Sequence, residues 1–326
     1  MSKYDSRLFL DENSSNAKIL KQVRKNTQVL EFGCACGKMT RYMKEQLGCS
    51  VYIVEMDEEA FHSAMAYAQD GLCADLEQME WLERFADVKF DSIIFADVLE
   101  HLRRPDLVLK KAGSLLKDDG MVLLSVPNIA HSDILVNLYE NNFQYMPLGL
   151  LDDTHIHFWG SKNLEKFCND AGYQVVVEDA TRVEPFLSEQ GQWIDSEKKT
   201  FYAQLLYGKE QYDVYQFLYT LQKKEYAAAY GLRKICKIER KFFGMNGSVI
   251  FDYGSGFAPE TVQELYPVKS YEDRFYYEIH VPQGAQHVVF HPVREKACIV
   301  FNLQAVSDRS GSIVPVQVKG TVLQNS

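Results

Sequence analysis

At the point that decides its fold, the chain reads Val29-Leu30-Glu31-Phe32-Gly33-Cys34-Ala35-Cys36-Gly37-Lys38. A short apolar run ends there in an acidic residue, and a turn of small residues leads into a helix-like segment. Small residues let the backbone approach a ligand closely. The start of a helix offers free N–H groups and the positive end of the helix dipole. The stretch therefore predicts a strand at 28–32, a helix at 38–47, and a ligand held between them at Glu31, Gly33, Ala35 and Gly37.

Strand-like and helix-like segments alternate along the first two hundred residues. Strand-like runs lie at 28–32, 51–54, 71–74, 92–96, 121–126 and 173–177, and a run at 202–206 is expected to close the sheet. Helix-like runs lie at 17–23, 38–47, 57–68, 105–116 and 161–171. Such alternation predicts an α/β fold with a doubly wound, mostly parallel, seven-stranded sheet and helices on both faces. We assign residues 1–208 to this domain.

The pattern changes in the last third of the chain. The run at 211–243 is rich in Tyr, Leu and Lys and holds no Pro, so we expect a helical connector at 209–243. Short alternating runs punctuated by Gly, Pro and Asp follow, and Phe275, Tyr277, Ile279 and Val281 would share one buried face. We predict a small all-β sandwich at 244–326.

The composition is that of an ordinary globular protein, with 46% hydrophobic and 25% charged residues among 326. A net charge of −10 argues against a protein that coats nucleic acid. The sequence has no apolar run long enough to predict a membrane span, and no signal peptide is recognised in it, so we expect a cytoplasmic protein. The seven cysteines are scattered without a CxxC pair, which argues against a disulfide framework.

The acidic residue and glycine turn resemble the first motif of class I S-adenosylmethionine-dependent methyltransferases, an acid followed by GxGxG, with Ala35 at the middle glycine. The resemblance implies S-adenosylmethionine as the cofactor in a Rossmann-like fold. It assigns the ribose hydroxyls to Glu55, the adenine to Met56, Asp75 and Leu76, and a place at the end of the fourth strand to Asp97. A dinucleotide-binding domain also ends its second strand in an acid, but the turn lacks the GxGxxG spacing of that class.

A second group of polar residues follows the fourth strand. If a helix begins there, Asp97, Glu100 and His101 share one face at positions i, i+3 and i+4. With His155 farther along the chain, the group resembles the metal-binding ExxEH motif and later histidine of small-RNA 2′-O-methyltransferases, and some ubiquinone-pathway O-methyltransferases share ExxEH. This resemblance implies Mg²⁺, Mn²⁺ or Zn²⁺ at Asp97, Glu100, His101 and His155. A metal-free alternative makes His101 or His155 the general base beside Glu100.

The acceptor side is less clearly marked. Asn128 and His131 follow the fifth strand, where residues of this fold line the crevice, although a Pro-Asn turn explains Asn128 equally well. The segment 142–151, with Phe143, Tyr145 and Met146, reads as a lid or acceptor loop, or as packing over the sheet edge. His157 alternates with His155 and is expected to face away from the site.

Taken together, these patterns predict O-methylation, because a hydroxyl needs a base or a metal to react whereas an amine needs less help. The segments at 276–282 and 288–294, and those at 125–128 and 151–155, resemble proteins of bacterial cell-surface polysaccharide assembly. That resemblance implies a sugar or glycan-precursor substrate. The alternatives are RNA-end 2′-O-methylation, which the acidic charge disfavours, and a non-catalytic glycan-binding or scaffolding protein. The β module could also serve packing or a homodimer.

Overall fold

A computed structural model describes residues 11–206, 209–238, 247–265, 269–271, 274–276, 279, 282, 284–285, 287–291, 305–306 and 313–314. The chain divides into two compact units. The first unit comprises Met1–Tyr202 with Gln211–Glu239, and the second comprises Ala203–Glu210 with Arg240–Ser326. No helix within the described residues is both long and apolar enough to traverse a bilayer.

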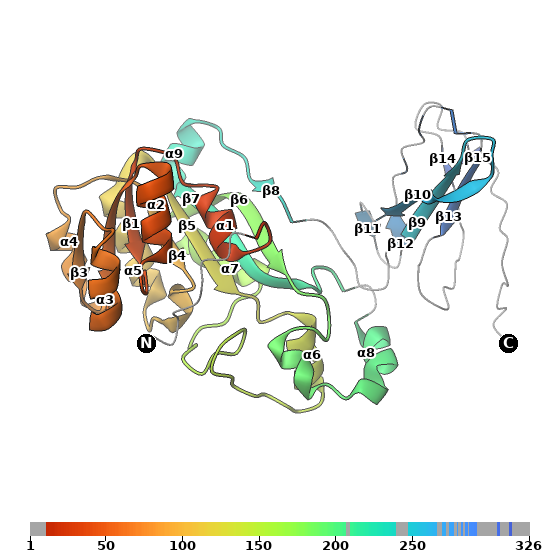
Figure 1. Cartoon of the computed structure of the whole chain (residues 1–326), viewed down its shortest axis with the longest axis horizontal. Helices are drawn as coiled ribbons and strands as arrows, with labels where there is room; N and C mark the ends of the chain where they lie inside the picture. Colours follow the sequence, from red (N-terminus) through yellow and green to blue (C-terminus); the bar gives the residue numbers. More distant parts are fainter. Residues whose placement is uncertain are drawn as a thin grey trace. The chain divides into compact units, whose positions relative to one another are not determined.

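The first unit is built on a doubly wound sheet (Figure 1). Its described strands run in the order β3-β2-β1-β4-β5-β7-β6-β8. Strands β3, β2, β1, β4 and β5 pair in parallel, while β7 is antiparallel to both β5 and β6. The bounds are β1 (Gln28–Phe32), β2 (Ser50–Glu55), β3 (Asp70–Cys73), β4 (Phe90–Ala96), β5 (Leu116–Pro127), β6 (Tyr173–Arg182), β7 (Val214–Lys223) and β8 (Ile235–Cys236). The predicted fold class is confirmed, and the two-residue β8 adds an eighth strand to the expected seven.

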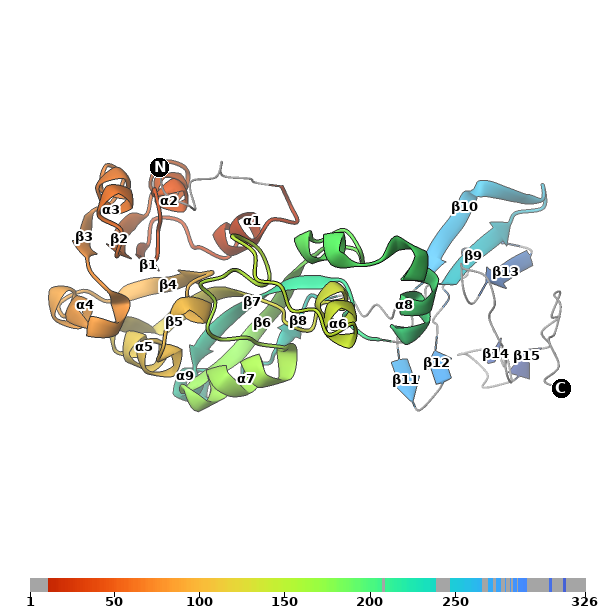
Figure 2. The ribbon, with the colours of Figure 1, turned by 90° about the horizontal axis from the view of Figure 1, so that it is seen from below.

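Helices cover both faces of this sheet. Figure 2 shows α1 (Ser15–Leu20), α2 (Lys38–Leu47) and α3 (Glu58–Met65) on one face, and α4 (Glu80–Arg84), α5 (Pro105–Ala112) and α7 (Ser161–Asp170) on the other. Each face has its own apolar core. One core gathers Met39, Met43 and Ala64 over β1 and β2, and the other gathers Trp81, Leu109 and Leu164 under Phe32 and Phe95. Apolar residues spaced for a helix thus bury one stripe of each helix against the sheet.

The expected helical connector at 209–243 is wrong. Residues Val214–Lys223 form β7, which lies inside the sheet between β5 and β6, and the short helix α9 (Lys224–Ala229) follows it. The run lacks strand alternation because a strand covered on both faces buries nearly all its side chains. The segment expected to close the sheet, 202–206, falls mainly in helix α8 (Lys199–Leu205).

The described strands of the second unit pair in antiparallel. One sheet has the order β10-β9-β13, with β9 (Gly247–Asp252), β10 (Phe257–Leu265) and β13 (His287–His291). The remaining strands pair as β11 (Lys269–Tyr271) with β12 (Arg274–Tyr276) and β14 (Ala305–Val306) with β15 (Ile313–Val314). The β character is as expected, and the sandwich arrangement stays a prediction. Tyr277 and Val281 lie outside the described residues.

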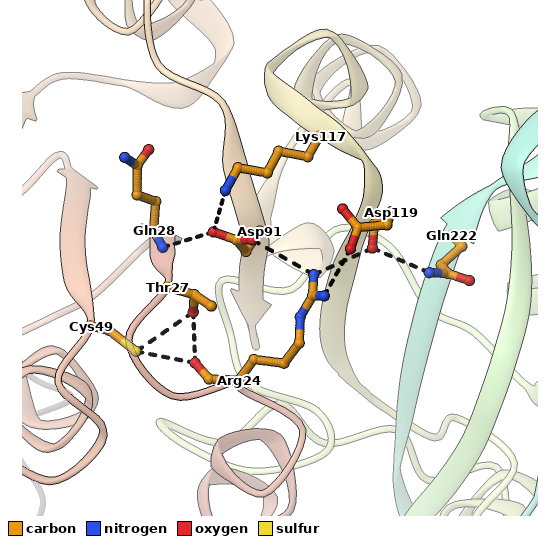
Figure 3. A network of polar contacts seen from close by, with 8 residues as sticks. All are labelled: Arg24, Thr27, Gln28, Cys49, Asp91, Lys117, Asp119 and Gln222. Atoms are coloured by element: carbon orange, nitrogen blue, oxygen red, sulfur yellow. Dashed lines mark hydrogen bonds and ion pairs between the residues drawn. The ribbon is translucent and has the colours of Figure 1, made fainter.

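Polar side chains tie together the amino ends of the central strands (Figure 3). The buried Asp91 of β4 accepts a backbone N–H from Gln28 at 2.9 Å and the ammonium of Lys117 at 2.8 Å. Arg24 lies 3.8 Å from Asp91 and 2.8 Å from Asp119. This network fixes the edge opposite to the glycine turn, which leaves the carboxyl edge of the strands for ligands.

Candidate active site

The glycine turn joins the end of β1 to the start of α2. Gly33 and Gly37 have φ angles of +66° and +76°, and Ala35 between them has +46°. A Cβ atom on Gly33 would lie 2.7 Å from Val98 Cγ2, and one on Gly37 would lie 2.6 Å from Ala64 Cα. Both positions therefore need glycine for conformation and for space. The turn has the backbone shape of a cradle that a ligand can approach closely.

Glu55 brings an acidic side chain to this cradle from the end of β2. Its Oε2 accepts the backbone N–H of Ala35 at 2.9 Å. Its Oε1 accepts the N–H groups of Met56 at 2.8 Å and Asp57 at 3.0 Å. The carboxylate thus joins the glycine turn to the turn before α3. The residue predicted to hold a ribose lies where two neighbouring strand ends meet.

Glu31 differs from Glu55 because it is buried, with 3% of its surface exposed. Burial raises the pKa of Glu31 to about 7, the charge of Glu55 raises it further, and a hydrogen bond from Thr40 opposes the shift. The Thr40 hydroxyl donates to Glu31 Oε2 at 2.6 Å. Sequence reasoning missed Thr40, although a hydroxyl in the first turn of the helix after a glycine turn is a signal that could have found it.

The residues predicted to bind adenine follow the ends of β2 and β3. Asp75 caps a short 3₁₀ helix, Leu76–Gln78, by accepting the N–H of Glu77 at 2.9 Å. Leu76 is buried, whereas Met56 is 74% exposed. An acid and two apolar side chains thus follow neighbouring strand ends, and their contact with adenine stays a prediction.

Asp97 does not join the metal-binding group that the sequence predicted. A 3₁₀ helix, Leu99–His101, stands in place of the expected α-helix, and Asp97 itself has a φ of +56°. Its Oδ1 accepts the hydroxyl of Ser125 at 2.9 Å and the amide of Gln216 at 2.8 Å. Burial raises the pKa of the Asp97 carboxyl above its ordinary value. These two hydrogen bonds hold the side chain toward β5 and β7. The prediction that Asp97 shares a face with Glu100 and His101 required a continuous α-helix, which this segment does not form.

Three of the four predicted metal ligands do come together. One ligand atom from each of Glu100, His101 and His155 lies within 4.8 Å of the other two, and we call this group the Glu-His-His cluster. Glu100 is fully buried, and neither carboxylate oxygen has a hydrogen-bond partner in the described part of the chain. Burial, with the nearby charges of Asp97 and Asp152, holds the pKa of Glu100 well above its usual range. The cluster can hold a divalent cation or a proton.

Backbone hydrogen bonds join the two distant parts of the cluster. The carbonyl of Glu100 accepts the N–H groups of Ile156 at 2.9 Å and His157 at 3.1 Å. His157 itself points elsewhere, since its ring stacks on Trp159 and its Nε2 lies 3.3 Å from the carbonyl of Arg103. Only one of the two alternating histidines therefore faces the cluster.

The two clustered imidazoles use the same ring nitrogen for outer contacts. Nδ1 of His155 lies 3.2 Å from the carbonyl oxygen of Leu150, and Nδ1 of His101 lies 2.9 Å from the hydroxyl of Thr154. A carbonyl only accepts, so Nδ1 of His155 carries the proton and Nε2 carries the lone pair. Outer contacts of this kind are common at metal and proton-transfer sites.

Asn128 and His131, predicted on the acceptor side, are buried and bonded within the protein. Asn128 donates its side-chain amide to the carbonyl of Val214 at 2.7 Å. His131 places Nε2 at 2.9 Å from the carbonyl of Val183 and accepts the N–H of Asp133 on Nδ1 at 3.2 Å. The hydrogen bond from Asp133 to His131 caps the start of α6 (Ser132–Tyr139). Both side chains have structural roles, and their contact with an acceptor stays a prediction.

Aromatic rings extend from the Glu-His-His cluster into the segment 142–151. Phe158 lies 6.5 Å from the ring of His155 and 6.4 Å from that of Phe143, which in turn lies 5.3 Å from Tyr145. Phe143 and Tyr145 are 40% and 51% exposed. The sequence predicted that these rings lie in a lid or acceptor loop, or in packing over the sheet edge, and the structure connects them to the cluster through Phe158.

Comparison with known proteins identifies the family. The family described as "Methyltransferase domain" matches residues 5–178, more than half of the chain. The chain is 26% identical over 154 residues to a protein named ubiquinone biosynthesis O-methyltransferase from Neisseria meningitidis serogroup C. It is 29% identical over 154 residues to one of the same name from Nitrosococcus oceani. The matches cover 45% of this chain and 64% of each relative, so the chain spans less than two thirds of their length.

Solved structures align with about two thirds of the chain. A SAM-dependent methyltransferase from Archaeoglobus fulgidus aligns over 65% of this chain and 93% of its own, with a TM-score of 0.47 and 16% identity. A methyltransferase from Burkholderia thailandensis with bound S-adenosylhomocysteine aligns with a TM-score of 0.41 and 16% identity, over 64% of this chain and 76% of its own. With the family match and the sheet order, the chain belongs to the class I S-adenosylmethionine-dependent methyltransferases.

Proposed function

We propose that the chain transfers the methyl group of S-adenosylmethionine to a hydroxyl oxygen of a small-molecule acceptor. The observation that carries this proposal is the Glu-His-His cluster, which lies past the end of β4 at the same sheet edge as the glycine turn. The residues present fit the cofactor: the turn has three left-handed residues, and Glu55 lies against it. When bound, S-adenosylmethionine supplies the electrophilic methyl group. The chain binds it through the turn, Glu55 and Asp75.

A hydroxyl acceptor suits the cluster better than an amine does. A hydroxyl is a weak nucleophile near neutral pH, so its proton must be accepted by a base or its pKa must be lowered. The lone pair on Nε2 of His155 can accept that proton. The names of the curated relatives, O-methyltransferases, support the same atom type.

The cluster also fits a divalent cation. Two imidazoles and one carboxylate form a ligand set typical of Zn²⁺ or Mn²⁺ rather than Mg²⁺, which prefers oxygen. The unpartnered, buried carboxylate of Glu100 supports this, because such a group needs a counter-charge or a proton. A bound cation would supply Lewis acidity to the acceptor oxygen. Glu100, His101 and His155 would hold it, without Asp97.

The exposed rings of Phe143 and Tyr145 favour an acceptor with a flat or apolar face. A sugar ring, which the resemblance to polysaccharide-pathway proteins implies, can pack on such rings through its C–H face. A phenol can stack on them as well. The acceptor proposal therefore covers ring-bearing alcohols, and the sugar or glycan precursor stays a prediction within it.

An acceptor panel tests the proposal. Methyl transfer from labelled S-adenosylmethionine is measured with phenols, free and nucleotide-linked sugars, and short RNA. We expect transfer to a hydroxyl compound, and His155→Gln should lower kcat about a hundredfold or more. His62→Gln, an exposed histidine on α3, is the matched control and should keep the wild-type rate. Transfer only to amines, or a wild-type rate for His155→Gln, would contradict the proposal.

A further inference from the structure

His101 has an outer contact unlike that of His155. Its Nδ1 lies 2.9 Å from the hydroxyl oxygen of Thr154, and this hydroxyl lies 2.7 Å from Oδ1 of Asp152. The three side chains form a line from a buried carboxylate, 2% exposed, through a hydroxyl to an imidazole of the Glu-His-His cluster. The proposed reaction and its family resemblance give no role to Thr154 or Asp152.

The direction of these hydrogen bonds follows from proton counting. A hydroxyl has one proton, and Thr154 donates it to Asp152. Its oxygen is then left with lone pairs, so the contact with His101 requires a proton on Nδ1 of the ring. In the neutral ring, Nε2 of His101 therefore carries the lone pair, as Nε2 of neutral His155 does. Both histidines offer the same kind of atom to the cluster.

The segment that carries Thr154 is firmly held. Oδ1 of Asp152 also accepts the N–H of Thr154 at 2.9 Å, and the carbonyl of Asp152 accepts the N–H of His155 at 3.0 Å. Met146 pairs with the same segment, since its carbonyl accepts the N–H of Asp153 at 2.9 Å. The Thr154 hydroxyl is thus fixed by backbone contacts on both sides, and it can orient a ring.

We propose that Asp152 and Thr154 are positioning residues that hold His101 in the Nδ1-protonated form, with its Nε2 lone pair directed at Glu100 and His155. The inference rests on the proposed function, since it gives that lone pair its use in holding a proton or a cation. Thr154 acts through His101 and does not itself touch the reacting atoms. Loss of the hydroxyl should release the ring to the other tautomer or orientation.

The experiment compares Thr154→Val, which keeps the shape but lacks the hydroxyl, with Thr154→Ser, which keeps the hydroxyl. Long-range proton–nitrogen spectra of the full chain with nitrogen-15 histidine report which ring nitrogen is protonated, and His101→Gln assigns the signal. We expect the wild type and Thr154→Ser to show Nδ1 protonated in His101, and Thr154→Val to lose this preference. Wild-type His101 protonated on Nε2, or a spectrum that Thr154→Val leaves unchanged, would overturn the proposal.

Turnover provides the second readout. Thr154→Val should lower kcat about tenfold to a hundredfold, with the KM for S-adenosylmethionine unchanged and Thr154→Ser close to wild type. Thr27→Val, at the opposite sheet edge, is the matched control and should keep wild-type kcat. If His101→Gln lowers kcat but Thr154→Val does not, the positioning role fails alone. If neither His101→Gln nor His155→Gln changes turnover, the proposed function of the cluster fails instead, while the spectrum still tests the tautomer.

Discussion

At the scale of single residues, surroundings separate the roles of similar acids. Glu31 and Glu100 are buried, whereas Glu55 is half-buried and accepts three backbone N–H groups. Burial penalises a carboxylate, so the pKa of Glu31 and of Glu100 lies above the ordinary value. Acids that look alike in the sequence therefore divide into one that accepts backbone hydrogen bonds and two whose charge is costly.

The raised pKa of Glu31 makes stability depend on pH. In the folded state Glu31 has a pKa of about 7, whereas the ordinary value is 4.5. As pH rises between these two values the unfolded chain releases this proton more readily than the folded chain does, so the free energy of unfolding falls. Glu31→Gln removes that cost while its amide oxygen can still accept the Thr40 hydroxyl. We expect the free energy of unfolding of the variant to exceed that of the wild type by up to about 3 kcal/mol near pH 8, with little difference near pH 4.

Urea unfolding of both proteins at several pH values measures this difference. Glu45→Gln, an exposed acid on α2, serves as the control and should track the wild type at every pH. A constant gap between Glu31→Gln and the wild type across this pH range would show that the carboxyl group does not titrate as the structure implies.

The sequence predicted the site residues that follow from chain spacing. Glu31, the glycines and Glu55 lie at strand ends or in the turn after them, and these places follow from the alternation of strands and helices. Contacts made across the sheet could not be predicted in this way. Asp97 bonds to Gln216 of β7, a residue 119 positions away, and this contact holds its side chain toward β7. Thr154 and His101 are 53 residues apart in the sequence, and only the fold brings the Thr154 hydroxyl into contact with the His101 ring.

At the scale of elements, the turn between β1 and α2 depends on close packing against α3. A Cβ at Gly37 would lie 2.6 Å from the backbone of Ala64, whereas one at Gly172 would meet nothing within 4 Å. Both glycines have a positive φ, so an alanine at either position costs about 1–2 kcal/mol in backbone strain. Gly37→Ala should cost about 1–3 kcal/mol more, from overpacking.

Thermal or urea unfolding of Gly37→Ala and Gly172→Ala checks this prediction, since the pair shares the backbone cost and differs in the clash. Gly37→Ala should also bind S-adenosylmethionine more weakly, because the turn must shift to fit the methyl group. Equal losses of stability in the two variants would show that α3 does not pack on the turn as described.

Elements with a clear pattern were predicted almost to the residue. β1 and α2 have the predicted bounds, 28–32 and 38–47. β7 was missed because all ten side chains of Val214–Lys223 are buried or half-buried without alternation, and a long run rich in Leu and Tyr fits a helix as well as a central strand. The pairing of this segment with β5 and β6 is what makes it a strand rather than a helix.

At the scale of the whole molecule, the first unit is not continuous along the chain. Its strand β7 follows the segment Ala203–Glu210, which belongs to the second unit, and pairs with β5 and β6. A fragment of residues 1–208, the domain predicted from sequence, would lack β7 and β8, which leaves β6 without its described strand partners and β5 paired only with β4. We expect residues 1–239 to fold cooperatively and residues 1–208 not to fold.

Circular dichroism and urea unfolding of the two fragments test this. A cooperative transition in the shorter fragment, with the midpoint of the longer one, would contradict the central place of β7. The β character of the second unit agrees with the prediction from the sequence. Neither fragment contains residues 244–326, so this experiment does not test the predicted role of the β module in packing or in a homodimer.

We propose that the turn at Gly33–Gly37 and Glu55 hold S-adenosylmethionine, and a calorimetric titration of the full chain measures this binding. We expect binding at one site. Glu55→Ala should weaken it about tenfold to a hundredfold, the loss expected for hydrogen bonds to a charged group, while Glu45→Ala on the surface of α2 leaves it unchanged. Absence of binding, or equal affinity in the wild type and Glu55→Ala, would contradict the account.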